Sequence, residues 1–253
     1  MTTNPRIRVR DATPADAPII TEIHYKAFAH GIMDQLMYPN GVTEDNRAKF
    51  AARLFPPPRS EDEKAKKGEN MVWVAEYVPD DGPAEIVAFS RWTLYRQPRP
   101  EEVWKVDAAY KPTLEMFGQG ANIEVIDTFV GEMRRMSERA AKGEAMLFLG
   151  ILACLPERQR LGAGSALLRR GVELADSLGL PMRLEASPEG YGLYKKFGFE
   201  AYDVLDTKVT ETWGPVQPEG SNWGNNNAAE LFGQAPKGVL RTVLMKRPVK
   251  VSN

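Results

Sequence analysis

The feature that most constrains this chain is an almost uninterrupted apolar run at residues 146–155. Such a run is typical of a β-strand that is buried on both faces, as in the middle of a sheet covered by helices. A turn containing glycine follows the run, and a segment of helical character follows the turn at 163–178. The sequence therefore predicts a central strand that leads through a tight turn into a helix, as expected of an α/β protein.

Further strands and helices surround this centre. Alternating apolar residues at 7–10 predict an opening strand, and Thr13 followed by Pro14 predicts the start of a helix. Two β-rich runs at 71–78 and 85–92 are separated by turn residues and predict a hairpin. The remaining predicted elements are a helix at about 44–54, a strand at 182–186, a helix near 190–197, a strand from Phe199 and a last strand at 239–245.

Two stretches do not follow this regular order. Residues 96–143 begin with several prolines and end in an amphipathic segment at about 122–141, which predicts a loop that leads into a helix. Residues 211–238 are rich in Gly, Asn and Pro. We expect a single domain over 1–253 that carries insertions at about 96–143 and 211–238.

Composition and charge exclude several classes of protein. Lys and Arg number 33 against 34 Asp and Glu, so the formal charge of -1 favours neither nucleic acid nor an anionic membrane as a partner. Cys154 is the only cysteine, which excludes an intramolecular disulfide, and the polar residues 1–5 do not resemble a signal peptide. No apolar run reaches ~18 residues, and His24 and His30 are the only histidines. We expect a cytoplasmic monomer or homodimer that binds no metal.

Residues 156–165 carry the first chemical signal. They leave a buried strand and open a helix whose first turn holds Gly162 and Gly164 and no bulky side chain. Such a backbone lets N–H groups point into a concavity, and the helix dipole adds partial positive charge, so the turn suits a pyrophosphate. Arg158 and Arg160 can add charge-assisted contacts. The competing interpretation is a plain tight turn, in which the glycines serve only the backbone geometry.

Two motifs in this region resemble those of a known family. Gln159-x-x-Gly162-x-Gly164 after a strand is similar to the Gln/Arg-x-x-Gly-x-Gly/Ala signature of the GNAT family of N-acetyltransferases. The segment 193–199, Leu-Tyr-Lys-Lys-Phe-Gly-Phe, resembles that family's Leu-Tyr-x-x-x-Gly-Phe motif. Both motifs stand at the expected distance from each other, which is more specific than either motif alone. The resemblance is strongest between Leu149 and Phe199.

The resemblance implies a fold and a coenzyme. The fold is a GNAT-like mixed, twisted sheet of six to seven strands, flanked by helices and splayed between its fourth and fifth strands. The coenzyme is acetyl-coenzyme A (acetyl-CoA), whose pantetheine arm would lie along main-chain groups of the fourth strand. The residues that the resemblance assigns to coenzyme binding are Leu152, Ala153, Cys154, Arg158, Gln159, Arg160, Leu161, Gly162, Ala163, Gly164, Ser165, Ser187, Tyr191 and Tyr194.

The resemblance also assigns catalytic roles. Tyr194 would lie beside the coenzyme sulfur and protonate the departing thiolate, whereas the competing interpretation is that it only packs on the sheet. A carboxylate is needed to take a proton from the acceptor amine. The fourth strand holds none, so the candidates are Glu144, Asp127 and Glu185, of which Glu185 is the one that we name as catalytic. Ser187 stands where many relatives carry Asn.

Other side chains bear on the acceptor. His30 follows the first helix, in a region that borders the acceptor pocket in this family, and Trp213 and Trp223 occupy the loop 211–238. These aromatic side chains either wall the acceptor side or anchor their loop. Cys154, inside an apolar strand, is expected to be a small buried hydrophobe and not an acetyl carrier.

The function that we expect is direct transfer of acetyl from coenzyme A to a primary amine of a small molecule, through a ternary complex. One alternative is a protein N-terminal or lysine acetyltransferase, which would need an open groove for its peptide. Another alternative is a sensor that binds acyl-CoA without turnover, since a fold does not fix a function.

Overall fold

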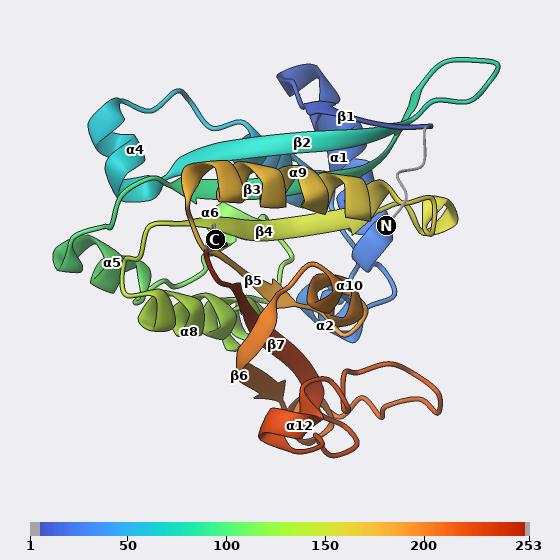
Figure 1. The fold of residues 1–253 in the computed structure, drawn as a ribbon. Helices are drawn as coiled ribbons and strands as arrows, with labels where there is room; N and C mark the ends of the chain where they lie inside the picture. The colour runs from blue at the N-terminus through green and yellow to red at the C-terminus, as the bar shows by residue number, and fades with distance from the viewer. Residues whose placement is uncertain (1–5, 251–253) are drawn as a thin grey trace.

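A seven-stranded sheet forms the centre of the protein (Figure 1). The structure is a computed structural model that describes residues 6–250, so the polar residues 1–5, which predict no signal peptide, lie outside the described residues. The strand order is β1-β2-β3-β4-β5-β7-β6, and only β4 and β5 pair in parallel. The mixed sheet confirms the predicted fold class. The strands are β1 (Ile7–Asp11), β2 (Glu69–Tyr77), β3 (Glu85–Tyr95), β4 (Met146–Cys154), β5 (Met182–Ala186), β6 (Glu200–Thr207) and β7 (Leu240–Arg247).

Helices cover both faces of this sheet. One core lies under α9 (Ala163–Leu178) and α10 (Tyr191–Lys196), and a second lies under α1 (Ala17–Phe28), α3 (Glu44–Leu54) and α7 (Ile123–Ile126). None of the helices within 6–250 is long and apolar enough to cross a membrane. The other helices are α2 (Ile32–Met37), α4 (Glu61–Lys67), α5 (Glu101–Asp107), α6 (Leu114–Phe117), α8 (Glu132–Ala141), α11 (Val209–Trp213) and α12 (Ala229–Phe232).

Several predicted bounds agree with the structure. The helix at 44–54, the helix at 163–178 and the strand at 182–186 have the predicted ends, and β2 and β3 form the predicted hairpin. The segment 122–141 is helical, but a π-helical stretch at Asp127–Gly131 separates α7 from α8. The helix predicted from Pro14 begins instead as a 3-10 turn, Pro14–Asp16, and α1 starts at Ala17.

A register shift divides β4 into two parts. Trp92 of β3 pairs with Leu149 and Arg91 pairs with Ile151, which leaves Gly150 without a partner on β3. Because side chains two apart in a regular strand share a face, one extra residue reverses the alternation. Leu149 accordingly packs in the core under α9, whereas Ile151 packs in the core under α1 and α3.

The strand β5 separates from β4 at the same point. The two strands pair only at Leu147–Met182, Phe148–Arg183 and Leu149–Leu184. Beyond this point β5 continues to pair with β7, up to Ala186–Val243. Figure 1 shows β5 and β7 turning away from β4. The second half of β4 therefore has a sheet neighbour on one side only, which confirms the predicted splay between the fourth and fifth strands.

The helix α9 lies close to the sheet because of one glycine. A Cβ atom at Gly171 would come within 2.5 Å of the Trp92 ring. The Trp92 side chain is fully buried and its indole N–H donates to Ser90 Oγ at 2.8 Å, so the ring is held in place. Gly171 thus sets the distance between α9 and β3, and with it the position of the first turn of α9.

The substitution Gly171→Ala is expected to lower the free energy of unfolding by about 1–2 kcal/mol. The steric clash of the new methyl group with Trp92 outweighs the higher helix propensity of alanine. Gly192→Ala in α10 is the matched control, since a Cβ there meets no heavy atom within 4 Å. Urea denaturation of both variants measures the difference. Equal stability of the two variants would contradict the packing role of Gly171.

Candidate active site

The unpaired edge of β4 offers main-chain groups to a ligand. The N–H of Leu155 bonds to the carbonyl of Val87 at 2.9 Å, on the β3 side. Because main-chain groups alternate in direction along an antiparallel pair, the N–H and C=O groups of Leu152 and Cys154 point away from β3. The strand β5, which would otherwise accept them, has already separated. An extended molecule with amide groups can therefore pair with this edge as an added strand would.

The turn from β4 into α9 contains N–H groups that no carbonyl of the helix accepts. Arg160 and Gly162 have φ of 67° and 89°, so the chain reverses through left-handed conformations. The first hydrogen bond within α9 runs from Ala166 N–H to Gly162 C=O at 2.9 Å. The N–H groups that precede Ala166 have no partner within the helix and carry the positive end of its dipole. Gln159 and Gly162 are exposed and Ser165 is half-buried, which leaves this turn open to an anion.

A close contact joins this turn to β4. A Cβ at Gly164 would meet Cys154 Sγ at 3.5 Å and side-chain carbons of Leu152 and Leu193 at 3.9 Å. Burial raises the pKa of the Cys154 thiol to about 11, although the N–H of Gly164 opposes the shift by donating to the sulfur. The thiol is therefore protonated near neutral pH, which agrees with the interpretation of Cys154 as a small buried hydrophobe.

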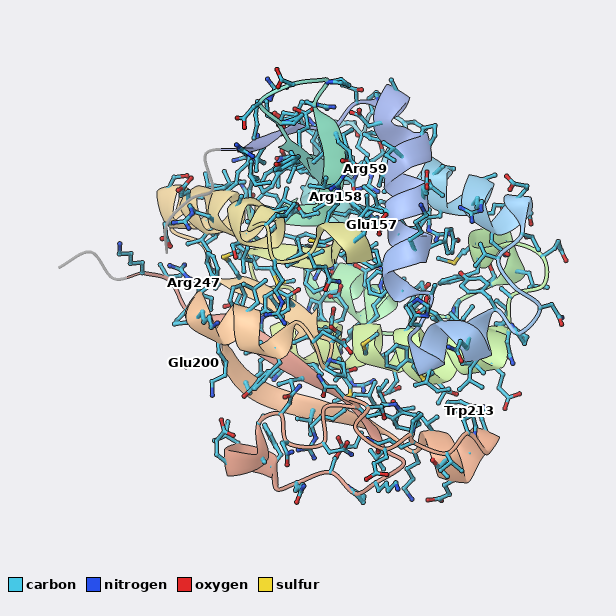
Figure 2. The ribbon with its side chains drawn as sticks, turned by 90° about the vertical axis from the view of Figure 1, so that its right-hand side faces the viewer. Arg59, Glu157, Arg158, Glu200, Trp213 and Arg247 are labelled. Carbon is cyan, nitrogen blue, oxygen red and sulfur yellow. The ribbon has the colours of Figure 1, made fainter. Side chains whose placement is uncertain are left out.

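Arg158 is partly engaged by the protein itself. Its guanidinium forms an ion pair with Glu85 at 2.7 Å, and Figure 2 shows Arg158 beside Glu157 on the turn between β4 and α9. The ion pair ties the start of β3 to this turn. Both side chains are more than a third exposed, so the pair contributes little stability and leaves the cation accessible.

Tyr194 is buried at the start of the second motif. Its side chain is 7% exposed, and its ring lies 6.0 Å from that of Phe199. Burial raises the pKa of the Tyr194 hydroxyl above its usual range, and the nearby Cys154 and Glu185 add to the rise. The hydroxyl therefore keeps its proton at neutral pH. Tyr194, Cys154 and Glu185, which come from α10, β4 and β5, therefore influence one another electrostatically.

Glu185 is the first residue of β5 beyond its pairing with β4. It points to the opposite face from Leu184, toward α8, where Ser137 Oγ donates to its carboxylate. Burial raises the pKa of Glu185 to about 7, the Ser137 hydroxyl opposes this rise, and Glu138 adds to it. A carboxyl with this pKa is ionised in a useful fraction at neutral pH while remaining basic enough to take a proton.

The other two candidate bases are engaged in ion pairs. Glu144 binds Arg183 at 3.0 Å and Lys246 at 2.7 Å. Asp127 binds Arg135. Within residues 6–250, Glu185 has no ion-pair partner. Among the three carboxylates named from the sequence, Glu185 is thus the one whose environment favours proton transfer.

Ser187 and Tyr191 hold the start of α10. Ser187 Oγ accepts from the N–H of Gly190 at 3.2 Å, and the Ser187 carbonyl accepts from the N–H of Tyr191 at 3.1 Å. Tyr191 is 8% exposed and packs in the same core as Tyr194. Ser187 therefore has a structural partner, and its assignment to coenzyme binding stays a prediction.

The three predicted acceptor residues lie in different settings. His30 is exposed in the turn between α1 and α2. Trp223 is 6% exposed, and its carbonyl accepts from the N–H of Arg241 at 2.8 Å, so it anchors its loop to β7. Trp213 ends α11, half-buried, and Figure 2 labels it near the edge of the molecule. Both tryptophans pack against the core under α1 and α3, and substrate contact by any of the three stays a prediction.

Sequence reasoning missed the partners of Glu185. Ser137 and Glu138 lie 48 and 47 positions before it, on a helix whose docking no local pattern predicts. It also passed over Arg91, a charged residue in the predicted strand 85–92. An arginine inside an otherwise largely apolar strand was the available signal, because arginine is almost never fully buried unless it is paired.

Comparison with known proteins shows the fold. No protein-family model matches the sequence, and no curated protein matches it. The chain is similar in structure to histone acetyltransferase HPA2 and related acetyltransferase from Corynebacterium glutamicum, at 20% identity over 98% of this chain and 99% of that chain, with a TM-score of 0.54. It is also similar to the mosquito arylalkylamine N-acetyltransferase like 5b, at 16% identity over 95% and 99% of the two chains, with a TM-score of 0.53.

These similarities and the strand topology define the class of structure. The protein has the fold of the GNAT superfamily of acetyltransferases, with a mixed sheet whose central parallel pair, β4 and β5, separates part-way along. Sequence identities of 20% and 16% show a shared fold, but they do not identify the substrate.

The raised pKa of Glu185 can be tested with the substitution Glu185→Gln, which removes the titratable group. The folded protein holds the Glu185 proton more tightly than the unfolded chain, because the pKa is raised from 4.5 to about 7. The tighter binding of the Glu185 proton stabilises the folded protein. This stabilisation is complete below pH ~4.5, where the unfolded chain is also protonated, and is lost as the pH rises through ~7. Glu185→Gln has no such loss, so its stability relative to the wild type should rise between pH 5 and pH 8 by on the order of 2 kcal/mol.

Chemical denaturation at both pH values measures this change. Glu200→Gln, at an exposed position on β6 that Figure 2 labels, is the control and should show a constant difference from the wild type. A constant difference for Glu185→Gln as well would mean that the carboxyl is not buried as described.

Proposed function

We propose that this protein is an acetyl-CoA-dependent N-acetyltransferase that transfers acetyl directly to a primary amine of a small molecule. The observation that carries the proposal is the meeting of three features where β4 and β5 separate. These features are an unpaired strand edge, a helix start with outward N–H groups, and the pair of buried groups Tyr194 and Glu185.

The residues present fit acetyl-CoA as a co-substrate. The edge groups of Leu152 and Cys154 bind the amides of the pantetheine arm, and the first turn of α9 binds the pyrophosphate. The coenzyme supplies an activated acetyl thioester when it is bound. Arg158 and Arg160 lie on the same turn and add positive charge for the phosphates.

Glu185 and Tyr194 move the two protons of the reaction. Glu185 takes the proton that the amine loses as the new N–C bond forms. Tyr194 gives a proton to the sulfur as the C–S bond breaks, and it is protonated beforehand because burial raises its pKa. The high pKa of the Cys154 thiol supports direct transfer over a relay through this cysteine.

The choice of a small acceptor is supported by the loop 211–238. Trp223 is buried, and Asn225 Nδ2 donates to the carbonyl of Pro236 at 2.8 Å, so internal bonds hold the loop in a folded arrangement. In our proposal this folded loop walls the acceptor side of the site, which suits a small amine better than a peptide, because a peptide needs an open groove. The alternative of a non-catalytic sensor is disfavoured by the raised pKa of Glu185, since a sensor needs no such group.

Coenzyme binding is tested by adding charge to α9. In Ser165→Glu, the new carboxylate in the first turn favours the helix dipole but repels a pyrophosphate. We expect calorimetry to show acetyl-CoA binding at least ~10-fold weaker, with thermal stability retained. Ser177→Glu, in the exposed last turn of the same helix, is the control and should bind like the wild type. Equal binding by both variants would refute the pyrophosphate assignment.

Turnover is tested by a free-thiol assay with an amine panel. Tyr194→Phe and Glu185→Gln should each lower kcat by ~10²–10⁴-fold, the usual effect of removing a general acid or base. In the wild type, kcat/KM should rise with pH through ~7 as Glu185 loses its proton, and this inflection should disappear in Glu185→Gln. Coenzyme binding without turnover of any amine would favour the sensor alternative.

A further inference from the structure

Four arginines gather on the face of the sheet opposite α9. This arginine cluster consists of Arg53, Arg59, Arg91 and Arg134, whose charges act on one another. Hydrogen bonds through Asn70 link the Arg91 side chain to the carbonyl of Leu54, the neighbour of Arg53 in α3. Arg91 points to the same face as Phe89, whose ring lies 6.4 Å from that of Phe50 on α3. The register partner of Arg91 is Ile151, in the part of β4 that has no β5 neighbour. The cluster therefore lies beside the splay, on the side away from the helix α9.

Aromatic rings and main-chain groups hold the other members of the cluster. The guanidinium of Arg53 lies 5.1 Å from the ring centre of Phe117 and donates to the carbonyl of Met116. The guanidinium of Arg134 lies 4.3 Å from the ring centre of Tyr110. The contacts fix these side chains without neutralising them, because a ring face attracts a cation but carries no net charge.

Arg59 completes the cluster from the loop after α3. It donates to the carbonyl of Gly68 at 2.8 Å, and Figure 2 labels it. Like Arg53 and Arg134, it is held by a neutral group.

Charge in the cluster is not balanced by the protein. Within residues 6–250, none of the four arginines has a carboxylate at ion-pair distance, whereas Arg10, Arg99 and Arg241 all do. The Arg91 side chain donates from Nε to the neutral amide oxygen of Asn70 at 3.0 Å. Asn70 is held in turn, because it donates to the carbonyl of Leu54 at 2.7 Å.

The lack of a carboxylate partner makes the charged form of Arg91 less stable relative to its neutral form. Burial and, to a smaller extent, repulsion from Arg53, Arg134 and Arg59 together lower the pKa of Arg91 to about 10. A largely desolvated cation without a carboxylate partner is costly, and the cost falls when an anion accepts hydrogen bonds from the guanidinium. Planar guanidinium groups match carboxylate and phosphate oxygens with two parallel bonds.

The cluster and the proposed base share one electrostatic environment. Arg134 lies close enough to Glu185 to lower the pKa of that carboxyl, in opposition to burial. A molecule whose anionic group is held by Arg91 and Arg134 can thus present its amine toward Glu185.

We propose that the arginine cluster binds an oxyanion of the acceptor, so that the acceptor is a small amine that also carries a carboxylate or a phosphonate. This proposal rests on the proposed function and names the substrate class for the same site. It narrows the expected acceptor from any small primary amine to one that carries an anionic group.

The first experiment is a substrate panel built of matched triples. Each triple contains an amino acid, its carboxamide and its aminophosphonate analogue, and thiol release from acetyl-CoA is followed with the full-length wild type. We expect kcat/KM to be at least ~10-fold higher for the charged members than for the carboxamide. The preferred charged member of each triple distinguishes a carboxylate site from a phosphonate site.

The second experiment uses variants of the cluster. Arg91→Gln and the exposed Arg134→Gln should each raise KM for the charged acceptor by ~10–100-fold, with a much smaller change in kcat and in acetyl-CoA affinity. KM for the carboxamide should change little. Arg139→Gln is the control on the same helix, since Arg139 is exposed and paired with Glu132 at 2.7 Å, and it should behave like the wild type.

A structural role for Arg91 is tested separately by stability. Arg91→Met removes an unbalanced buried charge while keeping the apolar part of the chain, so its thermal midpoint without substrate should equal or exceed that of the wild type. A midpoint several degrees lower would mean that Arg91 serves packing and would overturn the proposal.

The outcomes separate the two levels of inference. Equal use of charged acceptors and carboxamides, with no selective rise of KM in Arg91→Gln and Arg134→Gln, overturns the anion site and leaves the acetyltransferase standing. Acetylation of basic peptides, with no acetylation of charged small amines, also overturns the anion site. Failure to acetylate any amine, in a protein that binds acetyl-CoA, removes the proposed function and the substrate class with it.

Discussion

The register shift at Gly150 is the constraint on which the rest of the structure depends. Without the extra residue, Leu149 and Ile151 would share one face of the sheet. With it, the first half of β4 packs its leucines under α9, and the second half packs Ile151 and Ala153 under α1 and α3. The shift coincides with the end of pairing between β4 and β5. A bulge bends its strand, so a single residue accounts for the change of face and accompanies the divergence that leaves main-chain groups unpaired.

Electrostatics differ between the two sides of this divergence. On the α9 side, the positive charge comes from the partial charge of the helix N-terminus and from Arg158 and Arg160 on the preceding turn, since the first turn of α9 holds no charged side chain. On the opposite side, it comes from guanidinium groups that lack carboxylate partners within the described residues. Glu185 lies between these regions with a pKa set by burial against the nearby cation of Arg134. This arrangement supports our proposal of a reaction between an anionic co-substrate and an acceptor that carries an anionic group at a distance from its amine.

Much of the fold could be predicted from local patterns. The bounds of α3, α9 and β5 follow from periodicity, turn residues and proline, because these signals act within a few residues. The two motifs around Gly162 and Tyr194 identified the region in which the candidate site lies. The insertion of β7 between β5 and β6 had no such signal, since strand order depends on packing between distant segments.

The sequence by itself determined which residues are candidates for the chemistry: a glycine turn after a buried strand, a tyrosine in a second motif, and three carboxylates. Glu185 was named from the sequence, but only the tertiary structure shows how the environments of the three carboxylates differ, because a pKa depends on neighbours that are distant in the chain. Glu144 and Asp127 are held by cations, whereas Glu185 is buried against a hydroxyl from α8. The arginine cluster also exists only in three dimensions, since its four members come from α3, the loop after it, β3 and α8. Electrostatic interactions depend on distances in three dimensions, so the fold, and not the order of residues in the chain, places these cations near one another without carboxylate partners within the described residues.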